Sequence, residues 1–265
     1  MSVALQIIIP LALLTGLALV FSIIIAIFSK KFAVEVNPKI ELVENLLSGA
    51  NCGACGYAGC SAFAKALVEG DATLPSCSAT SKESKEEIAK ILGSDDIGES
   101  TVVIVACNGG NSCQNKYSYQ GYGDCASVEL LAGGSKACPV GCIGMSKCIM
   151  ECPHHAIELN EGHAMVKQEA CVQCGVCISH CPKKLIKRLP SKAIYYIACS
   201  SEDRGKEVRS YCKNGCIGCR ICVKNCKENA LSFENNLPVF DYDKCTACGV
   251  CFEKCPAKCI KKLDI

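Results

Sequence analysis

The sequence predicts an α+β protein in which one transmembrane helix at the N-terminus precedes several small cysteine-rich modules. Three observations lead to this prediction. Residues 3–28 form an uncharged apolar run, 26 of the 265 residues are cysteines, and nine of these cysteines recur at one constant offset. A small module buries too little apolar surface to be stable through burial alone. We therefore expect cysteine chemistry to stabilise each module.

The charge and motif content of the chain exclude two broad functions. The net charge is +2, from 28 basic and 26 acidic residues, so no basic surface of the kind that nucleic acid needs is expected. The sequence has no strand–Gly-x-Gly-x-x-Gly–helix unit, so NAD and flavin are expected to bind to other proteins. We expect no complete active site on this chain alone.

The apolar run from Val3 to Phe28 has the length of a membrane-spanning helix. Such a helix would be about 39 Å long, against roughly 30 Å of hydrocarbon. A cleaved signal peptide is the alternative, but no positive charge precedes the run and no small-residue cleavage site follows it. Lys30 and Lys31 come directly after the run, and positive charge stays on the cytoplasmic side. We expect a single-pass protein of the cytoplasmic (inner) cell membrane, with its N-terminus outside and everything from Lys30 onward in the cytoplasm.

The first four cysteines of the cytoplasmic part form one set. Cys52, Cys55 and Cys60 have C-x2-C-x4-C spacing, and the more distant Cys77 completes the set. The cytoplasm is reducing, which disfavours disulfides and favours metal ligation. Structural zinc sites usually pair two C-x2-C motifs, whereas three close cysteines with one remote cysteine are typical of an iron–sulfur cluster. The segment resembles the Fes-type four-cysteine domain of membrane electron-transfer complexes.

Three helices are expected around this first set of cysteines. Asn37–Leu47 has its apolar residues on one side, and Ser61–Glu69 is expected to form a short helix. The charge pattern of Ser81–Leu92 predicts a solvated helix and linker.

An internal repeat of 74 residues follows. The first copy contains Cys125, Cys138, Cys142, Cys148, Cys152, Cys171, Cys174, Cys177 and Cys181. The counterparts 74 residues later are Cys199, Cys212, Cys216, Cys222, Cys226, Cys245, Cys248, Cys251 and Cys255. Nine coincidences at one offset indicate the duplication of a structural unit. The sequences VIVAC, ending at Cys107, and YYIAC, ending at Cys199, are also similar.

The second copy resembles a bacterial two-cluster ferredoxin. Two runs with C-x2-C-x2-C-x3-C spacing begin at Cys216 and Cys245. In such runs the first three thiolates bind one cluster and the fourth binds the neighbouring cluster. One 4Fe–4S cluster is therefore assigned to Cys216, Cys219, Cys222 and Cys255. Its partner is assigned to Cys245, Cys248, Cys251 and Cys226.

The first copy departs from this pattern at one position. Cys171, Cys174 and Cys177 with Cys152 form a complete set. The companion set has Cys142, Cys148 and Cys181, but Met145 stands where the second cysteine should be. A neutral thioether is a poor substitute for a thiolate. We expect Cys138 to be the replacement, and a three-iron cluster is the alternative.

The cysteines that remain predict one further cluster. Cys107, Cys113 and Cys125 are expected to supply three ligands, and Cys199 or Cys212 a fourth that joins the two copies. Cys259 is expected to be a spare thiol near the surface. The total is about six clusters, five of them supported by the sets described above.

The expected order of parts covers the whole chain. The parts are a membrane anchor (1–30), a Fes-type 4Fe–4S domain (31–95), a cysteine-rich insert (96–140), a first ferredoxin-like module (141–198) and a second (199–265).

This order of parts resembles the B subunit of the Rnf complex, the membrane-bound ferredoxin:NAD oxidoreductase coupled to ion translocation. The sequence CNGG at Cys107 and YQGYGDC ending at Cys125 resemble the longer form found in anaerobic bacteria. The resemblance implies a translocase subunit that accepts electrons from reduced ferredoxin. It would pass them to membrane flavin and iron–sulfur subunits and finally to NAD.

Two other functions are weighed against this one. An electron-transfer subunit of a hydrogenase or formate dehydrogenase would share the ferredoxin modules, but not the anchor followed by a Fes-type domain. A cluster-assembly scaffold should hold exposed, incompletely ligated clusters, and the complete eight-cysteine module argues against it.

Overall fold

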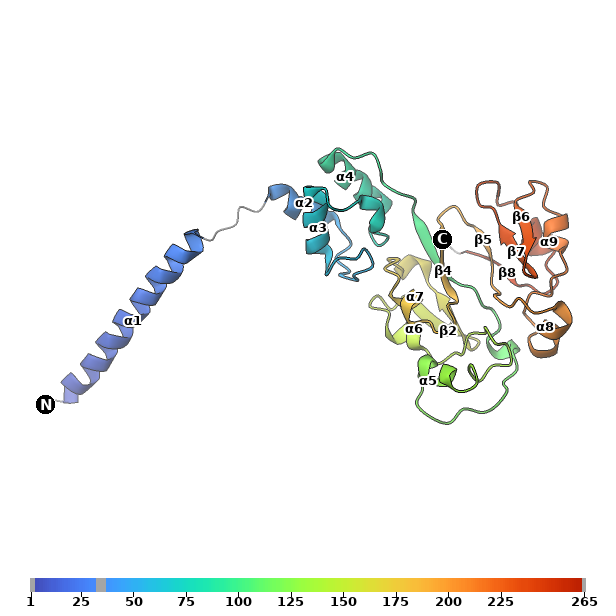
Figure 1. The fold of residues 1–265 in the computed structure, drawn as a ribbon, viewed down its shortest axis with the longest axis horizontal. Helices are drawn as coiled ribbons and strands as arrows, with labels where there is room; N and C mark the ends of the chain where they lie inside the picture. Colours follow the sequence, from blue (N-terminus) through green and yellow to red (C-terminus); the bar gives the residue numbers. More distant parts are fainter. Residues whose placement is uncertain (1–2, 32–36, 264–265) are drawn as a thin grey trace. The chain divides into compact units, whose positions relative to one another are not determined.

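The computed structural model describes residues 3–31 and 37–263, with side chains described for residues 13–28 and 37–263. The chain divides into two compact units, Met1–Ile40 and Glu41–Ile265. Figure 1 shows the elements of both units in chain order.

The first unit contains helix α1, Val3–Lys31, which confirms that the apolar run is helical. Its described side chains, at positions 13–28, are all exposed and carry no charge. Over the part of the chain described with side chains, no helix is both long enough and apolar enough to cross a membrane. The transmembrane role of the run therefore stays a prediction.

Three helices surround the first set of cysteines, as expected. They are α2 (Pro38–Leu46), α3 (Cys60–Glu69) and α4 (Lys82–Leu92), with the short 3-10 helix η1 (Leu74–Ser76) between α3 and α4. Val43, Phe63 and Ile88, one from each α-helix, are fully buried and form the centre of this domain. The side chain of Ser81 accepts a hydrogen bond from the N–H of Ser84 at 3.2 Å and so caps the start of α4.

The first ferredoxin module, here the strands and helices of residues 101–106 and 142–190, is built from two antiparallel strand pairs. Strand β1 (Thr101–Val105) pairs with β4 (Ile186–Pro190), and β2 (Ile157–Asn160) pairs with β3 (His163–Val166). The module also contains α6 (Lys147–Met150), η3 (Gln168–Ala170) and α7 (Val176–His180). Strand β1 lies within the residues expected to form the cysteine-rich insert. It pairs with β4, the last strand of the first module, and so belongs to that module.

The second ferredoxin module, residues 195–198 and 216–263, repeats this architecture. Strand β5 (Tyr195–Ile197) pairs with β8 (Ile260–Lys262), and β6 (Leu231–Glu234) pairs with β7 (Leu237–Phe240). Its helices are α9 (Ile221–Lys224) and α10 (Val250–Glu253). The matching strand order shows that the 74-residue repeat is a repeated fold.

In each module a connecting segment separates the first strand from the rest. The first connecting segment, residues 107–141, contains η2 (Gly110–Ser112) and α5 (Cys125–Leu130), and the second, residues 199–215, contains α8 (Gly205–Tyr211). The two segments meet in an antiparallel bridge between Cys113 and Cys212. The N–H of Gln114 donates to the carbonyl of Tyr211 at 2.8 Å, and the N–H of Lys213 donates to the carbonyl of Ser112 at 3.1 Å. The segments therefore join the two modules.

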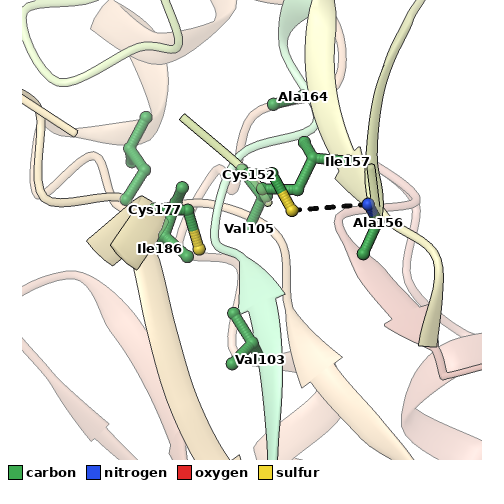
Figure 2. Packing of buried hydrophobic residues seen from close by; sticks show 9 residues of the cluster. Val103, Val105, Cys152, Ala156, Ile157, Ala164, Cys177 and Ile186 are labelled. Carbon is green, nitrogen blue, oxygen red and sulfur yellow. Dashed lines mark hydrogen bonds between the residues drawn. The ribbon is translucent and has the colours of Figure 1, made fainter. Parts of the chain in front are cut away.

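The core of the first module combines aliphatic side chains with cysteines. Val103 and Val105 of β1 pack with Ile186 of β4 and with the sulfur-bearing side chains of Cys152 and Cys177. Figure 2 shows these residues together. A core of this size is small, so burial of apolar side chains alone provides little stability to the module.

Candidate iron–sulfur sites

The first site is a cavity lined by Cys52, Cys55, Cys60 and Cys77, the four cysteines grouped from their spacing. Close backbone approach shapes this cavity. The side-chain oxygen of Asn51 accepts a hydrogen bond from the N–H of Cys60 at 2.8 Å. A Cβ on Gly59 would lie 2.8 Å from the same oxygen, so a larger residue there would displace the Asn51 side chain.

A buried lysine accompanies this site. Lys85 on α4 is 5% exposed, so the expectation that this helix is a solvated linker is wrong for its inner face. Burial lowers the pKa of Lys85, and the nearby Cys77 opposes that shift. An ammonium group here can balance negative charge on a cluster bound by four thiolates.

The four ferredoxin runs share one backbone conformation. In each run the residues two and four positions after the first cysteine have positive φ. These residues are Gly144 and Ser146, Gln173 and Gly175, Gly218 and Arg220, and Ala247 and Gly249. The run that starts at Cys142 therefore folds as a cluster-binding loop, although Met145 occupies its second cysteine position.

The fourth cysteine of each run also has a repeated environment. The residue three positions later has positive φ in all four cases: His155, Lys184, Asn229 and Lys258. This turn directs the next N–H at the sulfur. The N–H groups of Ala156, Leu185 and Ala230 lie 3.4, 3.4 and 3.3 Å from the sulfurs of Cys152, Cys181 and Cys226. Hydrogen bonds to ligand sulfurs are one of the means by which a protein sets cluster potential.

The second module brings its predicted sets together. One cavity is lined by Cys216, Cys219, Cys222 and Cys255, and another by Cys226, Cys245, Cys248 and Cys251. Each encloses about 350 Å³ of space, part of it open to solvent. Both groupings agree with the exchange of fourth cysteines expected from the sequence.

The first module also brings together its complete set. Burial, followed by the proximity of Cys171, Cys174 and Cys152, raises the pKa of Cys177 to about 12. Burying several thiolates side by side is unfavourable unless positive charge lies between them. Iron supplies that charge, so the donor set fits an iron–sulfur cluster, which when bound supplies one-electron oxidation and reduction.

A different cysteine from the one expected lies near the incomplete set of the first module. Burial raises the pKa of Cys148 to about 12, and the further causes are Cys142, then Cys125, then Cys181. Cys125 also packs in a small cluster with Met145. Cys138 lines another cavity, which Cys142 also lines, and the structure favours Cys125 over Cys138 as the replacement for a cysteine at position 145.

Helix α5 explains the position of Cys125. Glu129 on this helix forms an ion pair with Lys183 at 2.7 Å, and Lys183 also donates to the carbonyl of Gly133 at 2.7 Å. Lys183 lies two residues after Cys181, so these contacts hold Cys125, at the start of α5, beside that cysteine. No local spacing in the sequence signals this arrangement.

A further cavity lies where the two connecting segments meet. Six cysteines line it: Cys107, Cys113, Cys138, Cys142, Cys199 and Cys212. The sequence grouped Cys107, Cys113 and Cys125 with Cys199 or Cys212, and the structure brings all of these except Cys125 together. In the described part of the chain no three His, Cys, Asp or Glu side chains are close enough to hold a single metal ion. The cysteines instead surround cavities.

The fold and these cysteine sets define an iron–sulfur protein with a Fes-type domain and tandem ferredoxin-type modules. Residues 47–79 match the FeS family model, described as an Fe-S cluster, and residues 141–185 and 215–259 match the 4Fe-4S dicluster domain. The chain belongs to the family of B subunits of ion-translocating oxidoreductase (Rnf) complexes, as three relatives of nearly full coverage show.

These relatives are each 37% identical to the chain. The B subunit of the ion-translocating oxidoreductase complex of Methanosarcina acetivorans aligns over 95% of this chain and 96% of its own length. The B subunit of the Na⁺-translocating ferredoxin:NAD⁺ oxidoreductase complex of Acetobacterium woodii aligns over 96% of this chain and 77% of its own length. The B subunit of the proton-translocating ferredoxin:NAD⁺ oxidoreductase complex of Clostridium ljungdahlii aligns over 96% of this chain and 91% of its own length.

Proposed function

We propose that this chain is the electron-transfer subunit that accepts electrons from reduced ferredoxin. It passes them to flavin and iron–sulfur subunits in the membrane and, through those partners, to NAD. The observation that supports this best is the alignment over nearly the whole chain with relatives named as subunits of ferredoxin:NAD⁺ oxidoreductases. Each step moves one electron from one cluster to the next, so no bond forms or breaks and no proton is required.

We propose five 4Fe–4S clusters for this function. The Fes-type domain binds one and each ferredoxin module binds two. The ligands of the first cluster are Cys52, Cys55, Cys60 and Cys77. Those in the first module are Cys125, Cys142, Cys148 and Cys181, and then Cys152, Cys171, Cys174 and Cys177. Those in the second module are Cys216, Cys219, Cys222 and Cys255, and then Cys226, Cys245, Cys248 and Cys251.

We also propose that residues 1–30 anchor the chain in the cytoplasmic membrane, with the N-terminus outside and all clusters in the cytoplasm. The support is the uncharged run of residues 3–28, its helical conformation and the two lysines that follow it. The Fes-type domain then spans residues 31–95. The first ferredoxin module spans 101–190 with its connecting segment, and the second spans 195–263.

The test is reduction of the full-length, cluster-loaded chain by reduced ferredoxin under anaerobic conditions. The expected result is bleaching of the iron–sulfur absorbance and new electron paramagnetic resonance (EPR) signals, with no loss of iron from the chain. A chain that dithionite reduces but ferredoxin does not would contradict the proposed donor. Transfer of iron to an apo-protein, with no electron transfer, would favour the assembly scaffold instead.

A further inference from the structure

We infer that the chain holds one more 4Fe–4S cluster, between the two ferredoxin modules, with four sulfur ligands: Cys107, Cys138, Cys199 and Cys212. This inference rests on the proposed electron-transfer function and adds a site to it. None of these residues lies in the segments 47–79, 141–185 and 215–259 that match iron–sulfur family models. The ligand set differs from the sequence expectation, because Cys138 replaces Cys113 and Cys125.

The cavity between the connecting segments resembles those of the other sites. It encloses about 370 Å³, against 320 to 350 Å³ for the Fes-type cavity and the two cavities of the second module. Apart from the cysteines, its lining includes small or apolar residues such as Gly109, Val140, Ala198 and Val208. A cavity of the same size with the same donor atoms fits the same cofactor.

Two of the proposed ligands occupy equivalent places in the two modules. Cys107 lies two residues after the end of β1, and Cys199 lies two residues after the end of β5. The N–H of Cys142 donates to the sulfur of Cys107 at 3.4 Å. In the second module the N–H of Cys216 donates to the sulfur of Cys199 at 3.3 Å. Each sulfur therefore accepts a hydrogen bond from the backbone N–H of the first cysteine in its own ferredoxin module.

The other two ligands are equivalent as well. Cys138 and Cys212 each lie four residues before the first cysteine of a ferredoxin run, and a glycine follows each of them three positions later. A Cβ on Gly141 would lie 3.1 Å from the Cβ of Cys138, and one on Gly215 would lie 3.5 Å from the Cβ of Cys212. The glycines thus allow the backbone to pass close to both cysteines. The four ligands form two pairs related by the internal repeat.

Cys113 also lines the cavity, as does Cys142 of the first module, but Cys113 does not fit this relation. Cys113 lies six residues after Cys107, and the position six residues after Cys199 is Gly205, so Cys113 has no counterpart in the second copy. It is the partner of Cys212 in the antiparallel bridge, and its Sγ donates to the carbonyl of Gln114 at 3.7 Å. Because Cys113 lies outside the repeat that relates the other four cysteines, we leave it out of the ligand set.

A buried lysine provides an independent observation. Lys136 is 8% exposed, and its ammonium group donates to the carbonyl of Gly110, which lines the cavity, at 2.9 Å. Lys136 forms no ion pair with a carboxylate among the described residues. A buried ammonium group is costly unless negative charge lies nearby. A cluster bound by four thiolates carries net negative charge and would compensate it.

The position of this site gives it a role in electron transfer. Its ligands are hydrogen-bonded to Cys142 of one module and Cys216 of the other, which are themselves proposed cluster ligands. An electron leaving a cluster of one module would enter the bridging site and then leave it for the other module. The bridging cluster would therefore link two cluster pairs that are otherwise separate.

The test counts clusters in the full chain after anaerobic reconstitution with iron and sulfide. Iron and sulfide assays and native mass spectrometry are the readouts. Wild type is expected to bind six clusters, about 24 irons. Cys138→Ala and Cys199→Ala, one from each connecting segment, are each expected to bind five, about 20 irons, and to lose the same EPR signal. Cys113→Ala, from the same cavity, is the matched control and is expected to keep six.

The wild-type count keeps the inference testable if an alanine variant does not fold. A fully loaded wild type with five clusters would overturn the inference and leave the proposed function standing. Fewer than five would count against the proposed function itself. Loss of the cluster in Cys113→Ala, with retention in Cys107→Ala, would overturn the ligand set.

Discussion

The sulfur of Cys259 lies 3.6 Å from the sulfur of Cys255, a proposed ligand of the second module. Cys259 is 2% exposed, so the expectation of a spare thiol near the surface is wrong. A hydrogen bond from the Cys259 thiol lowers the pKa of Cys255 to about 5. The residue 74 positions earlier is Leu185, so only the second module has this thiol.

Replacing Cys259 by leucine, the residue of the first module, should lower the reduction potential of the cluster that Cys255 binds. Reduction adds negative charge to the sulfurs, and an S–H donor stabilises that charge by about 1 kcal/mol. Iron content should not change. EPR-monitored redox titration measures the effect, and Cys259→Ser, which keeps a donor, is the control. Loss of about four irons would instead make Cys259 a ligand.

Cys125 should be required for the cluster that Cys142, Cys148 and Cys181 share. Cys125→Ala is expected to destroy that cluster or convert it to a three-iron form, because a 4Fe–4S cluster needs a ligand for each iron. An iron assay and EPR of the anaerobic protein report the change. Unchanged signals from Cys125→Ala would rule out the assignment.

Adding Met145→Cys to Cys125→Ala should restore the lost cluster. Gly144 and Ser146, on either side of Met145, have the positive φ values of the corresponding Gly218 and Arg220. A cysteine at position 145 should therefore direct its sulfur as Cys219 does. The same substitution in Cys138→Ala is the control, and it should not recover iron, because Cys138 lines another cavity.

The sequence predicted the cysteine sets that depend on local spacing. It did not predict the contacts between segments that are far apart in the chain. The C-x2-C-x2-C-x3-C runs identified the sets of the second module, since one short loop supplies three ligands. Cys125 was assigned to another cluster because the ion pair of Glu129 with Lys183, which holds α5 beside Cys181, joins segments far apart in the sequence. The role of β1 was missed for a similar reason: a connecting segment of 35 residues, 107–141, separates it from the module it completes. The charge pattern of Ser81–Leu92 also gave no indication that Lys85 is buried.

Removing iron should unfold residues 101–265. The modules have small cores that include cysteines, so ligand bonds supply much of their stability. Circular dichroism before and after anaerobic chelation measures the loss. A native spectrum from the iron-free protein would refute the prediction.

Deleting residues 1–29 should release the chain from the membrane and leave its clusters in place. The uncharged run would be gone, and the cysteines all lie after it. Fractionation of cells that lack the partner subunits, followed by an iron assay, tests both points. A truncated chain that stays in the membrane fraction would show that residues 1–29 are not the sole anchor.

The last prediction concerns charge at the Fes-type site. Lys85→Met should lower the reduction potential of the cluster at Cys77, because reduction adds a negative charge that the buried ammonium group stabilises. The effect should be on the order of 1 kcal/mol, or tens of millivolts for one electron.

Lys82→Met is the matched control for this variant. Lys82 lies on the same helix, but its side chain is 68% exposed, so water screens its charge. Methionine keeps the length and apolar stem of both lysines, so packing around Phe63 and Ile88 should survive in each variant. A redox titration of the Fes-type EPR signal compares the two. Equal potentials in both variants would mean that the buried charge of Lys85 does not act on the cluster, and that its burial serves packing alone.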